Sequence, residues 1–185
     1  KASAREDKFQ LGYCYYKTGE TDKAIKLLLD IGAKNDLLSQ NIWNVLCDCY
    51  LKKDDKKRAQ LAFGEASKLD FDRKIKEESL FNYAKLTYEL AYSPFGEAIA
   101  SFQEYIELYP GSERIQEVYD YLVATYLQMK NYKAALSSLD KITKKDSRLE
   151  EAYQRVAFFR GMELFKNLEI EASVDMFDKS LKYEK

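Results

Sequence analysis

Apolar residues recur three and four positions apart along most of this chain, which is the spacing of one face of an α-helix. Two examples are the groups Ala24, Ile25, Leu28, Leu29 and Ile31, and Ala98, Ile99, Phe102, Tyr105 and Ile106. Helix boundaries follow the same pattern. Ser93-Pro94 offers an N-cap and a first-turn proline, and Ser147 has a glutamate three residues later, as a capping box requires. The pattern predicts an all-α fold.

A short motif also repeats along these helices. It consists of a small residue, an aliphatic residue directly after it, and a large apolar residue four places after the small one. The small residues are Ala24, Ala59, Ala98, Ala135 and Ser173, and the steps between them are 35, 39, 37 and 38 residues. The second instance departs from the motif, with Gln60 in the aliphatic place. A helical period near 34 residues indicates stacked helix pairs, each of which completes its core against the next.

With this period, the chain resembles five consecutive tetratricopeptide repeats over nearly its whole length. The first helix of such a repeat carries an aromatic residue, a Leu-Gly pair and a tyrosine. Here Trp43 takes the aromatic place, Leu11-Gly12 is the pair, and Tyr15 and Tyr50 take the tyrosine place. The resemblance implies a right-handed superhelical solenoid of about five helix-turn-helix pairs.

We expect a single domain over residues 1–185, and the polar helical pattern at Lys1 indicates a fragment of a longer protein. The repeats fall at approximately 5–38, 40–73, 77–112, 116–149 and 154–185. Small residues imply close helix approach, so Gly12 or Ala84 should meet Ala24 or Ala98 where paired helices cross. We also expect an apolar edge at the C-terminal end, covered by further repeats or by a second copy in a homo-dimer.

In the resembled fold the first helices of the repeats line a concave groove, which implies a partner-binding surface. Aromatic residues there are common anchors, and polar residues there owe nothing to core packing. The candidate groove residues are Phe9, Tyr13, Tyr16, Asn44, Asp48, Phe81, Lys85, Tyr88, Asp120, Phe158 and Met162. The alternative is that the aromatic members belong to the core, because aromatic residues at helical spacing are usually buried.

Composition limits the chemistry that this chain can perform. It has no histidine, which excludes Ser-His-Asp and Cys-His nucleophiles, and its seven glycines form no phosphate-binding loop. Cys14, Cys47 and Cys49 are interpreted as small buried hydrophobic residues. We therefore expect no catalytic residue, no metal and no cofactor, and the chain is not predicted to be an enzyme.

The leading hypothesis is a non-catalytic scaffold that binds a peptide or protein partner in the groove. An RNA-binding helical repeat is the alternative, but 30 basic against 31 acidic residues do not favour nucleic acid as a partner. No apolar run is long enough for a membrane span. The Lys and Asn clamp of chaperone-binding tetratricopeptide domains is absent, since Phe9 and Tyr13 stand in its places.

The segment from Phe102 to Ser112 is similar to a phrase of bacterial envelope tetratricopeptide proteins. This similarity favours a bacterial source and a role in envelope assembly, in the periplasm or cell envelope rather than the cytoplasm.

Overall fold

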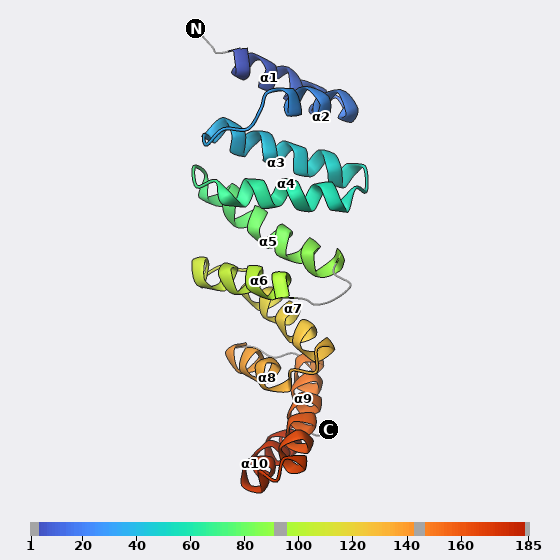
Figure 1. Ribbon diagram of the computed structural model, residues 1–185, viewed down its shortest axis with the longest axis vertical. Helices are drawn as coiled ribbons and strands as arrows, with labels where there is room; N and C mark the ends of the chain where they lie inside the picture. Colours follow the sequence, from blue (N-terminus) through green and yellow to red (C-terminus); the bar gives the residue numbers. More distant parts are fainter. Residues whose placement is uncertain (1–3, 91–95, 143–146, 184–185) are drawn as a thin grey trace. The chain divides into compact units, whose positions relative to one another are not determined.

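The computed structural model describes residues 4–90, 96–142 and 147–183, and within these ranges it holds ten α-helices and no strand (Figure 1). The all-α expectation of five helix pairs is confirmed. The helices are α1 (Ala4–Lys17), α2 (Thr21–Asp30), α3 (Leu37–Lys52), α4 (Lys56–Lys68), α5 (Arg73–Leu90), α6 (Gly96–Leu108), α7 (Ile115–Gln128), α8 (Tyr132–Lys141), α9 (Ser147–Lys166) and α10 (Ile170–Leu181). The expected Ser93-Pro94 boundary lies outside the described residues, whereas α9 does begin at Ser147.

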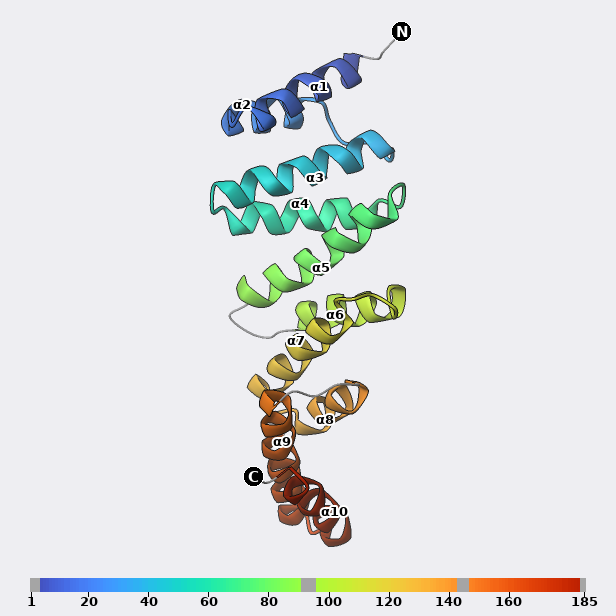
Figure 2. The ribbon, with the colours of Figure 1, turned by 180° about the vertical axis from the view of Figure 1, so that it is seen from behind.

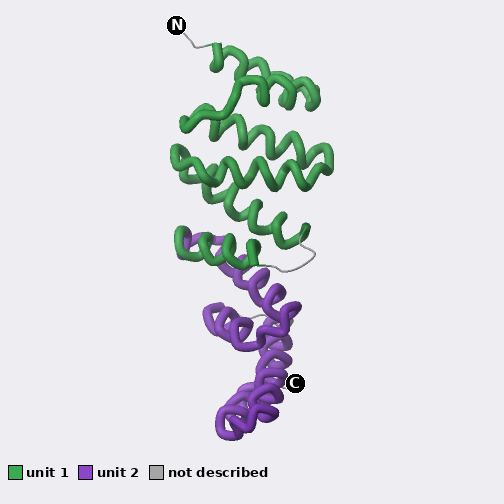
Figure 3. Tube along the Cα trace, in the orientation of Figure 1, with its two compact units in different colours: residues 1–108 green, residues 109–185 purple. Residues whose placement is uncertain are grey.

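The chain forms two compact units, residues 1–108 and residues 109–185 (Figure 3). The first contains α1 to α6 and the second contains α7 to α10. Within each unit, helices that follow one another in the sequence pack as neighbours, and α3 and α4 lie side by side in both views (Figure 1 and Figure 2). The expectation of a single domain over 1–185 stays a prediction.

Four hairpin turns in the described part of the chain share one backbone geometry. Gly19, Asp54, Lys130 and Leu168 occupy equivalent places in these turns and all have a positive φ, from 55° to 83°. In each turn the next residue donates its backbone N–H to a carbonyl five positions earlier, at 2.8 or 2.9 Å. This is the wrapped helix ending of the Schellman type. Those carbonyls belong to Tyr15, Tyr50, Tyr126 and Leu164, which all stand at the tyrosine place of the repeat.

The five small residues of the repeated motif occupy equivalent places in the second helix of each pair, and all are fully or almost fully buried. The crossing partner differs from the expectation. A Cβ atom on Gly12 would lie 2.8 Å from Leu28 Cδ2, and one on Gly161 would lie 2.7 Å from the Phe177 ring. The glycines thus leave room for the large residue of the motif, which is Leu28 in the first pair and Phe177 in the last. This large residue, rather than the small residue Ala24, reaches furthest toward the first helix.

A buried glutamine joins three helices of the first unit. Gln40 on α3 is fully buried, and its Nε2 donates to the carbonyls of Leu69 at 2.7 Å and Asp72 at 3.1 Å. Its Oε1 accepts from the Asp72 N–H at 2.7 Å. One side chain therefore satisfies the Leu69 carbonyl after α4 and the Asp72 N–H before α5, which would otherwise lack partners. The Asp72 carbonyl also accepts from the Lys76 N–H at 3.0 Å, so Gln40 is its second donor.

An ion pair fixes the first helix to the start of α3. Asp36 caps α3 by accepting from the Ser39 N–H at 2.8 Å, and Arg5 donates to its other carboxylate oxygen at 2.5 Å. Arg5 also donates to the carbonyl of Gly32 and the hydroxyl of Ser39. The Arg5 guanidinium is the main reason that the pKa of Asp36 falls from 3.8 to about 2.

Candidate functional site

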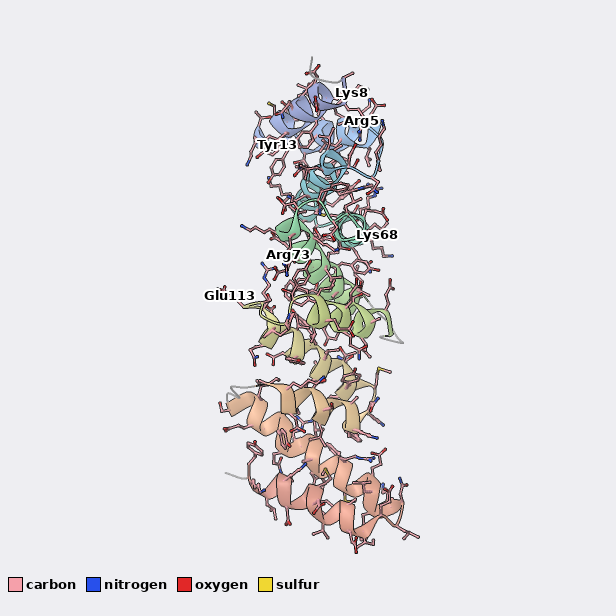
Figure 4. All side chains as sticks on the ribbon, turned by 90° about the vertical axis from the view of Figure 1, so that its left-hand side faces the viewer. Arg5, Lys8, Tyr13, Lys68, Arg73 and Glu113 are labelled. Atoms are coloured by element: carbon pink, nitrogen blue, oxygen red, sulfur yellow. The ribbon has the colours of Figure 1, made fainter. Side chains whose placement is uncertain are left out.

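Three aromatic side chains line one side of α1 and form what we call the aromatic shelf: Phe9, Tyr13 and Tyr16. The rings of Phe9 and Tyr13 stack with centroids 6.1 Å apart, and those of Tyr13 and Tyr16 lie 5.8 Å apart. Each is half-buried, packing against the core of the first unit while part of its surface faces solvent. Figure 4 shows Tyr13 extending from one side of α1, with Arg5 and Lys8 toward the other.

The shelf is joined to α3 by a hydrogen bond in which the Tyr16 hydroxyl donates to Asp48 Oδ2 at 2.9 Å. Burial and this bond raise the pKa of Tyr16 to about 12, so the phenol stays protonated and keeps donating at neutral pH. Two of the predicted groove positions on α1 and α3 are thus in direct contact.

Two lysines border the shelf. The Lys52 Nζ lies 4.1 Å from the centre of the Tyr16 ring, and the Lys17 Nζ lies 5.1 Å from Tyr13 and 5.3 Å from Tyr16. Each contact is worth about 0.5–1 kcal/mol at an exposed site. Within the described part of the chain neither ammonium group has a carboxylate partner, which leaves both available to an acidic ligand.

The sequence interpretation missed both lysines. Lys17 follows Tyr13 by four residues and Lys52 follows Asp48 by four residues, so each falls on the same helix face as a candidate groove residue. That spacing was the signal that could have identified them.

The other candidates of the first unit are distributed differently. Asn44 on α3, and Lys85 and Tyr88 on α5, are half-buried. Phe81 is only 5% exposed and packs edge-on against Tyr105, with ring centroids 5.8 Å apart. The assignment of Phe81 to a binding surface is corrected: it is a core residue, because it fills the space between α5 and α6.

The remaining candidates lie in the second unit, apart in sequence from the shelf. Asp120 on α7 and Met162 on α9 are half-buried, and Phe158 on α9 is exposed. The Phe158 ring contacts Phe159 and Phe177, at centroid distances of 5.8 and 5.9 Å. The surface with the most organised chemistry is therefore the shelf with Asp48, Lys17 and Lys52.

A second hollow of about 580 Å³ lies among α8, α9 and α10. Its acidic and basic side chains are interspersed, and two of them already have partners. Asp140 accepts from the Tyr153 hydroxyl at 2.9 Å, and Arg160 pairs with Glu163 at 2.6 Å. The lining of this hollow contains no aromatic side chain, so it offers a ligand no ring face of the kind that the aromatic shelf presents.

The cysteines behave as expected at two of three positions. Cys47 and Cys49 are fully buried, and burial raises the pKa of both thiols, that of Cys49 to about 11. Cys14 is exposed, which corrects its assignment to the core. The described residues contain no cluster of three or more metal-ligating side chains. Among their helices, none combines the length and the apolar character that a membrane crossing demands.

Comparison with known proteins gives one family match and several structural likenesses. Residues 8–35, which include the whole aromatic shelf, match the family described as tetratricopeptide repeat. The structure of MamA AMB-1 aligns with a TM-score of 0.51 and 15% identity, covering 96% of this chain and 90% of that one. A substituted form of the Podosopora anserina putative kinesin light chain nearly identical TPR-like repeats aligns with a TM-score of 0.50 and 9% identity, covering 99% and 97%. The curated proteins include no match to this chain. At such identities the likeness concerns the fold.

Proposed function

We propose that this chain, which matches the tetratricopeptide repeat family over residues 8–35, is a scaffold that holds a peptide segment of a protein partner on the aromatic shelf. The observation that carries this proposal is the grouping of three half-exposed rings with two ammonium groups that have no carboxylate partner in the described chain.

The chemistry of the shelf defines the kind of segment that fits it. Ring faces of Phe9 and Tyr13 offer a large contact area at small loss of side-chain entropy, and they suit an apolar or aromatic side chain. Lys17 and Lys52 suit a carboxylate next to it. The partner segment therefore combines an apolar anchor with one or two acidic residues.

The bond between Tyr16 and Asp48 has a supporting part in this proposal. It holds α1 against α3 and orients the shelf, so that little ordering remains to be done when a partner binds. The two ammonium groups of Lys17 and Lys52 outnumber the single carboxylate of Asp48, so the shelf carries a net positive charge toward a ligand. A role in envelope assembly is part of the proposal only through the similarity of the Phe102–Ser112 segment.

A selection experiment tests the proposal. A displayed library of random 12-residue peptides is enriched on the immobilised chain, and the affinity of the enriched peptides is measured by fluorescence anisotropy. We expect peptides with an apolar or aromatic residue beside Asp or Glu. The substitution Tyr13→Ala should weaken binding at least tenfold, whereas Phe71→Ala, at an exposed aromatic residue outside the shelf, should leave it unchanged.

The double substitution of Lys17 and Lys52 by alanine separates the two parts of the interaction. It should remove the preference for acidic peptides and keep the preference for apolar anchors. Equal affinities for Tyr13→Ala and Phe71→Ala would refute the proposed site. The same selection with an RNA library tests the nucleic-acid alternative. RNA ligands that are enriched on the chain, and that displace none of the selected peptides, would favour that alternative.

A further inference from the structure

One residue of α9 departs from a rule that its equivalents follow. In the first four repeats, the leucine place of the Leu-Gly pair holds a large apolar side chain: Leu11, Leu46, Tyr83 and Leu122. In the last repeat, Arg160 stands there, directly before Gly161. A position that breaks a local rule of the fold is a candidate for function.

The first unit shows what this side chain does in other repeats. The Tyr83 ring of α5 lies against α4, since a Cβ atom on Gly64 would lie only 3.1 Å from Tyr83 Cε2. The Tyr83 hydroxyl donates to Glu97 of α6. The ring therefore spans the seam between two successive second helices. Leu46 is fully buried, and the void that it lines between α2 and α3 measures only about 30 Å³.

In the second unit, the corresponding seam between α8 and α10 is open. Arg160 lines the hollow of about 580 Å³ described above, which has the volume of a small-molecule site. Every residue of its lining belongs to α8, α9, α10 or the turn before α10. The hollow is thus bounded on both sides by helices of this chain, labelled in Figure 1, and lies between two repeats rather than on an outer face.

The guanidinium of Arg160 is held at the hollow and is only partly used. The side chain is 21% exposed, and its Nη1 donates to Glu163 of the same helix at 2.6 Å. A guanidinium has five N–H donors and a flat face that stacks on aromatic rings. The described residues supply no other acceptor to it, so its remaining donors are available to a ligand.

The rest of the lining combines apolar surface with charges of both signs. Leu136 and Leu164 are buried, and Met176 is half-buried. Five charged side chains of the lining have no ion-pair or hydrogen-bond partner in the described part of the chain: Lys133, Lys141, Lys179, Glu169 and Asp175. The hollow therefore offers a ligand apolar contact, ammonium groups and carboxylates together.

This mixture of charges selects among ligands. A simple anion would be attracted by the three lysines and repelled by Glu169 and Asp175, and a simple cation would meet the reverse. A zwitterion can place each of its charges beside the opposite sign. The open seam, which a tyrosine ring fills in the first unit, has room for an aromatic ring as well.

We propose that this hollow binds a free aromatic amino acid. Its ring lies on Leu136 and Met176 beside the Arg160 guanidinium, and fills the seam as the Tyr83 ring does in the first unit. Its carboxylate pairs with the ammonium groups of the lining, and its ammonium group pairs with the carboxylates. This site is separate from the aromatic shelf, and the inference does not depend on the proposed function.

The test is an NMR titration of the full ¹⁵N-labelled chain with four small molecules. L-Phenylalanine has the ring and both charges, 3-phenylpropanoate lacks the ammonium group, phenethylamine lacks the carboxylate, and L-leucine lacks the ring. We expect L-phenylalanine to bind with a dissociation constant of about 1 mM or lower, and to shift amide signals of α8, α9 and α10. The other three molecules should bind at least fivefold more weakly.

Variants locate the site. Arg160→Leu restores the apolar residue of the other repeats, so it should keep the helices and weaken binding of L-phenylalanine at least fivefold. Arg155→Leu, at an exposed arginine of α9 outside the lining, is its control and should bind like the unaltered chain. Circular dichroism checks that both variants remain folded.

A second pair of variants tests the role of the carboxylates. The double change Glu169→Gln and Asp175→Asn should bind L-phenylalanine no more tightly than 3-phenylpropanoate. The matched double change Glu171→Gln and Asp178→Asn, at exposed acids of α10 outside the lining, should keep the preference for L-phenylalanine.

Three results would overturn the proposal. They are 3-phenylpropanoate or phenethylamine binding as tightly as L-phenylalanine, unchanged binding by Arg160→Leu, and signal shifts outside α8, α9 and α10 alone. Equal binding of N-acetyl-phenylalanine amide, which has the ring but neither charge, would also overturn it, because an aromatic residue within a partner chain would then suit the hollow as well as a free amino acid.

Discussion

Replacing Gln40 by leucine removes the amide that joins α3, α4 and α5 while keeping a side chain of similar size. The change withdraws the donor from the Leu69 carbonyl and the acceptor from the Asp72 N–H, so these two groups lose their partner. The Asp72 carbonyl loses one of two donors and keeps the Lys76 N–H. Each half-buried backbone group left without a partner costs about 1–3 kcal/mol. Since Leu69 and Asp72 are themselves only half-buried, we expect a loss of about 2–4 kcal/mol in the free energy of unfolding.

The assay is urea unfolding of the chain, followed by circular dichroism, with Gln10→Leu on the exposed side of α1 as the control. Hydrogen exchange adds a local reading, because the Asp72 amide should lose protection in the Gln40→Leu variant. A loss below about 0.5 kcal/mol, with Asp72 still protected, would refute the reasoning, since surface substitutions alone have effects of that size.

The variant Gln40→Glu probes the same site through pH. A carboxylate here would face two carbonyl oxygens and little solvent, which raises its pKa in the folded state above the ordinary value of about 4.3. Stability should then be greatest below pH 4, where the group is protonated in both states. It should fall as the pH rises through the folded-state value. A variant whose stability does not change between pH 4 and 7 would contradict this account.

Further predictions concern the ion pair, a turn and a close approach. The carboxylate of Asp36 has its pKa lowered to about 2 by its arginine partner, so its contribution is complete above pH 4 and is lost as the pH falls toward 2. Because the Asp36 side chain is 37% exposed, we expect the ion pair to contribute only about 1 kcal/mol to the free energy of unfolding. Acid unfolding curves of the Asp36→Asn variant should lack this pH-dependent contribution. Leu168 has a φ of 64°, so Leu168→Gly should raise stability by about 1 kcal/mol in thermal unfolding. Gly161→Ala should cost about 1–3 kcal/mol because its Cβ would meet the Phe177 ring, whereas Gly96→Ala, with open space around it, should show no such loss.

Much of the fold could be predicted from local pattern. The motif around Ala24, Ala59, Ala98, Ala135 and Ser173 identified the second helix of every pair, because burial of a small residue at a helix crossing depends on spacing alone. The helix boundaries at the Tyr109–Ser112 segment and at Ser147 were also predictable, because these residues have well-defined turn and capping preferences.

The candidate site was predictable only in part. The spacing of Phe9, Tyr13 and Tyr16 put all three on one face of a helix, and the structure brings Tyr16 onto Asp48 of α3. It also buries Phe81, although the same positional rule selected it, because α6 supplies Tyr105 to cover that ring. The position of a residue in the repeat predicts the direction of its side chain. It does not predict which side chain of a neighbouring helix lies against it.

By itself the sequence determined the helices, their pairing and the small residues at their crossings, since these depend on contacts within about forty residues of chain. Only the tertiary structure decided that Gln40 is a buried link rather than an exposed polar residue, and that Tyr105 covers Phe81. Both depend on which backbone or side-chain groups of other helices come within a few ångströms, and that proximity exists only once the helices are stacked.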